Sequence, residues 1–355
     1  NYENSRKVAR KMADAIEAAG NDTVAGDCHL ANGGILQETG TQPLHPLQIV
    51  AINDVTGTNS LVYLTKYDST HGRFPGTVGS REGVLRINED DISVFSEQDI
   101  TKLPWEALGI DLVMECTGAF SDRATAALHL QSGARRVLFS QPAQSDVDAT
   151  VIYGVNEGSL TLSDRIISNA SCTTNCVVPV IKCLDDNFGI DHGVITTIHS
   201  AMNDQPVIDA YHHFDLRKTR SAVQSIIPVN TEIDKGIGRI LPHLEGRFAA
   251  QAMRVPTINV SAIDLTVTVR ADVTMDMVNA AVRQGAKDSL PLVLDYTDEP
   301  LASCDFNHDP RSAIVDLSQT RVSGTRLVKV LAWFDNEWAF ANRMLDVAET
   351  IRKME

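Results

Sequence analysis

Short apolar runs alternate with helical segments over the first part of the chain. The runs at residues 48–53, 112–116 and 137–140 each end in polar residues that open into a loop, and a further short strand is expected at residues 23–28. Residues 123–132 have the pattern of a helix that stops at Gly133. Buried strands that alternate with helices form parallel sheets, which bind ligands at the carboxyl ends of their strands. The pattern therefore predicts an α/β domain.

The rhythm changes after residue 190. Longer strands, several with alternating apolar and polar positions, are expected at residues 193–199, 258–269, 301–306, 313–319 and 326–334. Their short separations favour a mixed or antiparallel sheet. Amphipathic helices are expected at residues 275–286 and 337–353. These elements predict a second domain of the α+β class.

The composition and net charge exclude several classes of protein. With 355 residues, 43% of them hydrophobic and 22% charged, the chain has the size of about two globular domains. Its net charge of −15 repels nucleic acid and anionic membrane surfaces, and no apolar run approaches the ~20 residues of a membrane-spanning helix. Six cysteines without a CxxC pair give no support for a metal site or a secreted disulfide scaffold. We therefore expect a cytoplasmic protein.

One segment carries most of the chemical information. Residues 168–176 read SNASCTTNC and lead into an apolar helical run at residues 177–184. A thiol at a helix N-terminus is expected to have a lowered pKa, which favours the nucleophilic thiolate, and Cys172 holds that position. The alternative is that Cys172 and Cys176, four residues apart on one helical face, are both buried packing cysteines. His199, at the end of a β-branched run, is a candidate base for the thiol, although a lone histidine there could simply be hydrogen-bonded.

These residues have a recognisable order. The segment SNASCTTNC, followed 27 residues after Cys172 by His199, resembles the phosphorylating glyceraldehyde-3-phosphate dehydrogenase superfamily. Four further segments share the resemblance, which runs from about residue 48 to the end: YDSTHGRF (67–74), RVP (254–256), DFNHDPRSAIVD (305–316) and WFDNEW (333–338). Within that superfamily, residues 199–212 look closest to the erythrose-4-phosphate dehydrogenase branch.

The resemblance implies a role for each matching residue. Cys172 would be the nucleophile that attacks the aldehyde carbon, and His199 would be the base that activates the thiol. NAD would be bound by Asp54, which would meet the adenosine ribose, by Thr117 and Ser140 at strand ends, and by Asn336, which would hold the nicotinamide carboxamide. Asp204 and Arg254 would meet the substrate phosphate. The site at which inorganic phosphate attacks in the glyceraldehyde enzymes would correspond to Ser171, Thr173 and Thr231.

Each of these assignments has a plainer alternative. Asp54 could cap the next turn, Arg254 could pair with a surplus carboxylate, and Asn336 could simply terminate a strand. The resemblance also implies a Rossmann-like parallel-sheet NAD domain, residues 49–171 and 336–355, and a catalytic domain, residues 172–335. It further implies a homotetramer whose small-molecule substrate is a sugar phosphate.

Two departures bear on the substrate. Met202 stands where the glyceraldehyde enzymes carry a threonine that contacts phosphate, and methionine cannot donate that hydrogen bond. Glu232 stands where they carry a glycine and places a carboxylate near the inorganic phosphate site. Both changes favour water over phosphate in resolving the thioester. We therefore expect oxidation of D-erythrose 4-phosphate to 4-phosphoerythronate, with an implied role in pyridoxal phosphate biosynthesis; a phosphorylating glyceraldehyde-3-phosphate dehydrogenase is the alternative.

The N-terminal segment, residues 1–48, departs further. The glycine-rich turn G-x-G-x-x-G of the family is absent, the nearest glycines are Gly33 and Gly34, and residues 6–19 have the pattern of an amphipathic helix. Residues 6–48 resemble the tail of the cysteine-rich domain of heterodisulfide-reductase-like proteins. The first βα unit is therefore expected to be atypical. It could be a divergent unit that still works, or the chain could be an impaired dehydrogenase that lacks the pyrophosphate-binding turn.

Overall fold

The computed structural model describes residues 23–27, 47–212 and 215–354. The chain divides into two compact units. The first comprises residues up to 151, 159–170 and 341 onward, and the second comprises residues 152–158 and 171–340. We describe each unit by itself.

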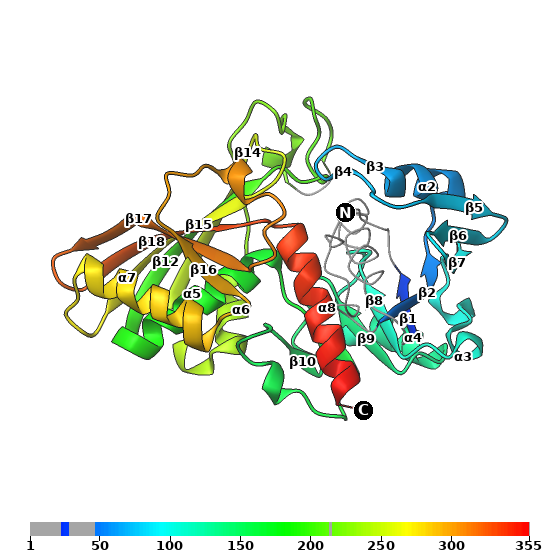
Figure 1. The fold of residues 1–355 in the computed structure, drawn as a ribbon, viewed down its shortest axis with the longest axis horizontal. Helices are drawn as coiled ribbons and strands as arrows, with labels where there is room; N and C mark the ends of the chain where they lie inside the picture. Colours follow the sequence, from blue (N-terminus) through cyan, green and yellow to red (C-terminus); the bar gives the residue numbers. More distant parts are fainter. Residues whose placement is uncertain (1–22, 28–46, 213–214, 355) are drawn as a thin grey trace. The chain divides into compact units, whose positions relative to one another are not determined.

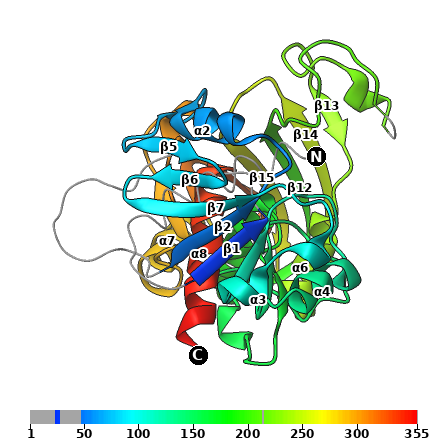
Figure 2. The ribbon, with the colours of Figure 1, turned by 90° about the vertical axis from the view of Figure 1, so that its right-hand side faces the viewer.

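A nine-stranded sheet forms the centre of the first unit. Its order is β10-β11-β9-β8-β1-β2-β7-β6-β5, and Figure 2 shows β5, β6, β7, β2 and β1 following one another in this order. All pairs from β10 to β7 are parallel, whereas β7, β6 and β5 pair antiparallel. The strands are β1 (Thr23–Asp27), β2 (Gln48–Asn53), β5 (Val78–Arg81), β6 (Val84–Ile87), β7 (Asp90–Phe95), β8 (Leu112–Glu115), β9 (Arg136–Phe139), β10 (Ala149–Thr150) and β11 (Ile166–Ser168).

Strand β1 lies at the point where the chain changes direction across this sheet. It pairs with β2 on one side and with β8 on the other. The β2–β7 half and the β8–β9–β11 half thus extend in opposite directions from β1, as in a Rossmann-like dinucleotide-binding fold. The strand expected at residues 23–28 is therefore confirmed. The expected helix at residues 6–19 and the glycines after β1 lie outside the described residues.

Short helices and buried apolar side chains complete the first unit. The helices are α2 (Thr58–Lys66), η1 (Ile100–Lys102), α3 (Trp105–Leu108) and α4 (Arg123–Gln131), and β3 (Tyr67–Asp68) and β4 (Gly72–Arg73) form a separate two-stranded sheet. The short η2 (Glu157–Ser159) falls mostly in the second unit. Helix α4 begins at the N-cap Asp122, which accepts a hydrogen bond from Thr125 N, and ends before Gly133 as expected. Gly133 has φ 107°, and a Cβ there would collide with Glu106, so this turn requires glycine. One core cluster packs Trp105 and Phe139 against α4.

A mixed seven-stranded sheet forms the second unit. Its order is β13-β14-β12-β15-β18-β17-β16, in which β14–β12 and β17–β16 are parallel and the other pairs antiparallel. Figure 1 shows α5 and α7 side by side against this sheet, and both helices pack against β17. The strands are β12 (Ile190–Ser200), β13 (Ile227–Val229), β14 (Phe248–Val255), β15 (Ser261–Val269), β16 (Leu294–Thr297), β17 (Ala313–Ser323) and β18 (Leu327–Phe334).

The remaining helices mostly match the expected pattern. They are α5 (Cys172–Phe188), η3 (Arg217–Thr219), α6 (Ile233–Ile240), η4 (Pro242–Leu244), α7 (Met275–Gln284), η5 (Gly285–Ser289), η6 (Ser303–Phe306) and α8 (Trp338–Lys353). The strand expected at residues 301–306 is wrong, because a 3₁₀ turn occupies most of it. The Asp305 carboxylate accepts a hydrogen bond from Ala302 N (2.8 Å), and this local bond stabilises the turn instead of an extended strand.

Candidate active site

Helix α5 places Cys172 at its first position. Ser171 is the N-cap, and its hydroxyl accepts a hydrogen bond from Thr174 N (3.0 Å). The preceding residue, Ala170, has φ 54°, which is uncommon for a residue with a side chain and turns the backbone sharply into the helix. The expected location of the thiol at a helix N-terminus is therefore confirmed.

The thiol faces an imidazole from the neighbouring sheet. Cys172 Sγ lies 3.6 Å from His199 Nε2. His199 Nδ1 lies 2.9 Å from the carbonyl oxygen of Ser200, a pure acceptor, so Nδ1 carries the proton and Nε2 presents its lone pair to the thiol. Thr173 Oγ1 is 3.9 Å from the sulfur. The two residues selected from the sequence as nucleophile and base therefore form a geometrically competent pair.

The expected lowering of the thiol pKa is wrong for this structure. Burial raises the pKa of the Cys172 thiol above its ordinary value, and a hydrogen bond from Thr173 and the charge of Arg254 only partly oppose this. Burial also lowers the pKa of His199 to about 3, and the positive charge of Arg254 acts in the same direction. Desolvation thus outweighs the helix N-terminus, and the resting pair is a neutral thiol beside a neutral imidazole.

Cys176 behaves differently from Cys172. It is fully buried, and burial raises the pKa of its thiol well above the ordinary value. The packing interpretation therefore applies to Cys176, whereas Cys172 remains partly exposed.

Arg254 provides a buried positive charge beside this pair. It lies on β14, directly opposite His199 in the parallel register with β12. Its Nε and Nη1 atoms are buried and donate to no acceptor among the described residues. Burial lowers the pKa of Arg254, and the charges of Asp204 and Cys172 oppose that shift. Buried guanidinium donors without partners indicate a place for an anionic ligand.

Asp204 lies near this charge and is followed by Gln205, and Lys218 pairs with Asp204. Asp204 Oδ2 pairs with Lys218 Nζ at 2.7 Å, while Asp204 Oδ1 is buried without a partner in the described part of the chain. The side chain of Gln205 is also buried, and neither its oxygen nor its nitrogen is bonded to a described residue. Lys218 and Gln205 carry no local sequence signal, although Gln205 does follow Asp204 directly. Two cations and one carboxylate leave the cluster with a net positive charge.

The expected inorganic phosphate residues lie at the N-terminal ends of two helices that pack together, α5 and α6. Ser171 and Thr173 flank Cys172 at the α5 N-terminus. Thr231 is half-buried just ahead of α6, which packs against α5. Glu232 is exposed and bonds to Lys235 at 2.5 Å, and this pair lowers the pKa of the Glu232 carboxyl. Because Lys235 offsets its charge, Glu232 contributes less repulsion of phosphate than the sequence suggested.

Asn336 is held by two serines that the sequence analysis did not identify. Its Oδ1 accepts hydrogen bonds from Ser200 Oγ (3.0 Å) and Ser261 Oγ (2.8 Å). Its amide nitrogen donates to no described residue and therefore remains available to an acceptor such as a carboxamide oxygen. Ser200 follows His199 directly, so one strand end positions both the base and this amide.

A buried carboxylate fixes the loop that carries Asn336. Asp335 Oδ1 accepts hydrogen bonds from the backbone nitrogens of residues 337 and 338, and Oδ2 accepts from His308 N (2.9 Å) and Asn259 Nδ2 (2.9 Å). Val260 (φ 62°) and His308 (φ 67°) both have left-handed backbone conformations, which cost free energy in non-glycine residues. The bonds to Asp335 oppose that cost and hold the loops in place.

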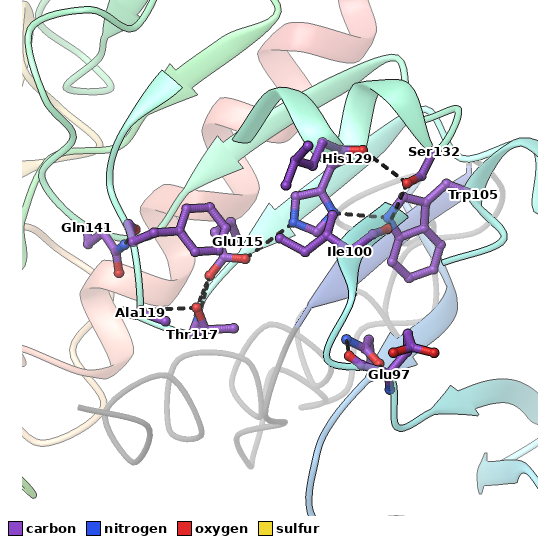
Figure 3. Close-up of polar contacts among 12 residues, drawn as sticks. Glu97, Ile100, Trp105, Glu115, Thr117, Ala119, His129, Ser132 and Gln141 are labelled. Carbon is purple, nitrogen blue, oxygen red and sulfur yellow. Dashed lines mark hydrogen bonds and ion pairs between the residues drawn. The ribbon is translucent and has the colours of Figure 1, made fainter. Parts of the chain in front are cut away.

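The expected cofactor residues of the first unit lie at the carboxyl ends of neighbouring strands. Asp54 follows β2 and is buried, and its Oδ1 accepts hydrogen bonds from Thr56 N (2.7 Å) and Thr56 Oγ1 (2.8 Å), so it does also cap a turn. Thr117 follows β8, and its backbone and hydroxyl both donate to Glu115 Oε1 (Figure 3). Ser140 follows β9, and its hydroxyl bonds to no described residue.

These features fit a dinucleotide. The sheet changes direction at β1, a carboxylate follows β2, and polar side chains follow β8 and β9. Over the described ranges, no three or more His, Cys, Asp or Glu side chains gather in a way that could hold a metal ion. Nor does any helix in those ranges have the length and apolarity needed to cross a membrane.

Comparison with known families gives two matches. Residues 36–123 match the NAD-binding domain of glyceraldehyde 3-phosphate dehydrogenase, and residues 171–336 match the C-terminal domain of the same enzyme family. Together they cover more than two thirds of the chain. The matches identify NAD as the cofactor and aldehyde-phosphate oxidation as the general activity. The chain belongs to the glyceraldehyde 3-phosphate dehydrogenase family.

Proposed function

We propose that the protein oxidises D-erythrose 4-phosphate to 4-phosphoerythronate with NAD, through a thioester on Cys172. The observation that carries this proposal is the Cys172–His199 pair, 3.6 Å apart, with the buried donors of Arg254 opposite His199. A nucleophile, a base and an anion-binding group are the parts that oxidation of an aldehyde phosphate requires.

The first step forms a bond between sulfur and carbon. His199 Nε2 accepts the thiol proton as Cys172 Sγ attacks the aldehyde carbon, and the carbonyl oxygen then takes that proton to give a thiohemiacetal. The neutral imidazole presents an unprotonated Nε2 to the thiol, because Nδ1 carries the proton. Arg254 and Lys218 bind the substrate phosphate, and Asp204 orients Lys218.

The second step removes hydride from the same carbon. His199 accepts the hydroxyl proton, and the thiohemiacetal becomes a thioester. When bound, NAD supplies the hydride acceptor. Asn336 donates its free amide hydrogens to the nicotinamide carboxamide, and Asp54 accepts hydrogen bonds from the adenosine ribose. A carboxylate at Asp54 also disfavours the 2′-phosphate of NADP.

Water completes the reaction. His199 first releases to solvent the proton that it took from the thiohemiacetal hydroxyl. It then takes a proton from water, the hydroxide attacks the thioester carbon, the carbon–sulfur bond breaks and His199 returns the proton to Cys172 Sγ. The balance is aldehyde, NAD and water in, and carboxylic acid, NADH and a proton out. Ser171 and Thr173 stand on either side of Cys172 and supply hydroxyls to this site. Thr231 lies just before helix α6, which packs against α5.

Met202 favours water over phosphate as the group that attacks the thioester. Methionine cannot donate a hydrogen bond at this position, where the glyceraldehyde enzymes have a threonine. The similarity of residues 199–212 to the erythrose branch supports the same choice. The charge of Glu232 adds little, because Lys235 pairs with it.

Product analysis tests the proposal. Purified protein is incubated with NAD and either D-erythrose 4-phosphate or glyceraldehyde 3-phosphate, each with and without inorganic phosphate, and products are identified by mass spectrometry. We expect faster NADH formation with the erythrose substrate and an acid product that does not depend on phosphate. Strong acceleration by phosphate with formation of an acyl phosphate would instead support the phosphorylating alternative.

We also propose that the protein acts as a cytoplasmic homotetramer. The segment around β13 exposes large apolar side chains, with exposed fractions between 58% and 86%: Val207, Ile208, Tyr211, Leu216, Val223 and Ile226. Clustered exposure of this kind favours association with another protein surface. Analytical ultracentrifugation should give one species of four chains, and Leu216→Glu should shift it to smaller species.

A further inference from the structure

Two buried serines fix which way the carboxamide of Asn336 faces. Asn336 Oδ1 lies 3.0 Å from Ser200 Oγ and 2.8 Å from Ser261 Oγ. Ser200 is completely buried, and Ser261 is only 2% exposed. Their hydroxyl hydrogens have no other acceptor among the described residues. Both hydroxyls therefore donate to Oδ1, and the hydrogens on Asn336 Nδ2 remain available to a ligand.

Ser261 also bonds to the strand end that carries the base. Its Oγ accepts a hydrogen bond from Ser200 N (3.0 Å), just beyond the last paired residues of β12 and β15, Ile198 and Ala262. The backbone oxygen of Ser200 in turn accepts a hydrogen bond from His199 Nδ1 (2.9 Å). One hydroxyl thus joins the residue that orients the imidazole to the carboxamide.

The backbone just before Ser261 is strained. Val260 has φ 62°, a left-handed conformation that costs free energy, most of all in a β-branched residue. On the other side of Val260, Asn259 Nδ2 donates to Asp335 Oδ2 (2.9 Å). The two neighbours of the strained residue therefore bond to two consecutive residues of one loop, Asp335 and Asn336. Backbone strain that is held in this way is concentrated at functional sites.

Asp335 anchors this loop independently of Ser261. Its carboxylate is completely buried and accepts four hydrogen bonds from described residues, three from the backbone nitrogens of residues 308, 337 and 338 and one from the Asn259 amide. All four remain when the Ser261 hydroxyl is removed. We expect the loop then to keep its path, while the Asn336 carboxamide loses a bond that sets its orientation.

We propose that Ser261 is a positioning residue that orients the Asn336 carboxamide toward the nicotinamide of NAD, and that the left-handed backbone of Val260 places it there. Ser261 acts through Asn336 and takes no part in proton transfer. The inference rests on the proposed role of Asn336 and is independent of the choice of sugar phosphate.

Binding of NAD and of ADP-ribose to the full chain, measured by calorimetry, tests the inference. ADP-ribose lacks the nicotinamide ring, so it reports the contacts of the rest of the cofactor. For Ser261→Ala we expect NAD binding to weaken about tenfold and ADP-ribose binding to change less than about twofold. Equal weakening of both ligands, or unchanged NAD binding, would overturn the proposal.

Two further serine variants complete this experiment. The matched control is Ser132→Ala, which should alter neither affinity, because the Ser132 hydroxyl donates to the backbone oxygens of Ile100 (2.7 Å) and Leu128 (3.0 Å) in the first unit. Ser200→Ala removes the second donor to Asn336 Oδ1 and should show the same selective loss of NAD binding. It decides the matter if Ser261→Ala folds poorly, and an unchanged NAD affinity would then overturn the proposal.

A double-mutant cycle tests the route through Asn336. Asn336→Ala should itself weaken NAD binding about tenfold or more, and adding Ser261→Ala to it should weaken binding less than about twofold further. Additive losses would show that Ser261 acts by another route and would overturn the inference.

The two single variants also separate this inference from the role on which it rests. If Asn336→Ala binds NAD as tightly as the wild type, the nicotinamide role of Asn336 is wrong, and the inference is wrong with it. If Asn336→Ala loses affinity and Ser261→Ala does not, only the inference is wrong. None of these measurements uses a sugar phosphate, so the proposed reaction is decided by its own products.

Discussion

The two units place buried charged groups in different surroundings. In the second unit, Arg254 and Asp204 keep buried polar atoms without partners among the described residues, close to the reactive pair. In the first unit, Trp105, His129 and Glu115 face one another, and Glu115 also binds the backbone of Thr117. A buried polar atom without a partner costs about 1–3 kcal/mol, so such atoms persist where a ligand satisfies them.

This contrast separates two kinds of buried charge. The Arg254 cluster is incomplete within the protein and is expected to gain its bonds from a phosphate group. Glu115 binds Thr117 through Oε1 and faces His129 through Oε2 within the first unit, so it is expected to hold the loop after β8. Loss of a group from the first kind should affect phosphorylated substrates, whereas loss from the second should affect the loop that it holds.

Removal of the nucleophile should have the largest effect. Cys172→Ala should lower the rate of aldehyde oxidation by at least about 10⁴-fold, because no thioester can form, while NAD affinity stays within about twofold. Steady-state kinetics and calorimetry measure the two quantities. Cys304→Ala is the control, because Cys304 is exposed. If Cys172→Ala retained most of its activity, Cys172 would not be the nucleophile, and the reactive site would not be the one described in the second unit.

Removal of the base should have the next largest effect. His199→Asn should lower kcat by about 10²–10³-fold, because the thiol and the thiohemiacetal lose their proton acceptor. Since the two residues act as one unit, adding His199→Asn to Cys172→Ala should cause little further loss. A large additional loss in the double variant would mean that His199 acts apart from Cys172.

Replacement of Arg254 tests whether its buried guanidinium acts only on phosphorylated substrates. Arg254→Met should lower kcat/KM for D-erythrose 4-phosphate about 10²-fold, because bonds from a charged donor to phosphate are lost. Oxidation of unphosphorylated glyceraldehyde should change little. Arg326→Met is the matched control, because Arg326 is exposed and pairs with Asp272. Equal losses for both aldehydes would argue against a phosphate role for Arg254.

The low pKa of His199 predicts a dependence of stability on pH. Because burial lowers this pKa from 6.5 to about 3, the unfolded chain binds the proton first as the pH falls below 6.5. Folded-state stability should therefore fall with decreasing pH in that window. Between pH 7 and pH 5 the wild type should lose about 2 kcal/mol more than His199→Asn in urea unfolding. Identical losses would show that His199 titrates alike in the folded and unfolded chain.

Strongly patterned elements of the fold were predictable from the sequence. The strands after which Asp54, Thr117 and Ser140 lie, and the helix that begins at Cys172, follow from apolar runs bounded by polar residues. Strands β5, β6, β7, β13, β14 and β16 were not predicted, because partner strands rather than their own pattern stabilise them. The wrong strand at residues 301–306 reflects a local bond from Ala302 N to Asp305 that propensity does not report.

The residues of the site were likewise predictable only where the local sequence has a strong pattern. Cys172 and His199 were found because each sits at the end of a regular element with a distinctive local sequence. Lys218, Ser200 and Ser261 were missed because their roles depend on partners far away in sequence: Lys218 binds Asp204, and Ser261 reaches Asn336 across paired strands. The thiol pKa was misjudged because burial, which a single sequence does not specify, outweighs the helix N-terminus.

A single-turnover experiment tests the central claim most directly. Protein is mixed with NAD and D-erythrose 4-phosphate, quenched in acid and digested, and the cysteine peptides are weighed by mass spectrometry. We predict a 4-phosphoerythronyl thioester on Cys172 that requires NAD and is absent from His199→Asn on the same timescale. No adduct, or an adduct confined to another cysteine, would contradict oxidation through Cys172.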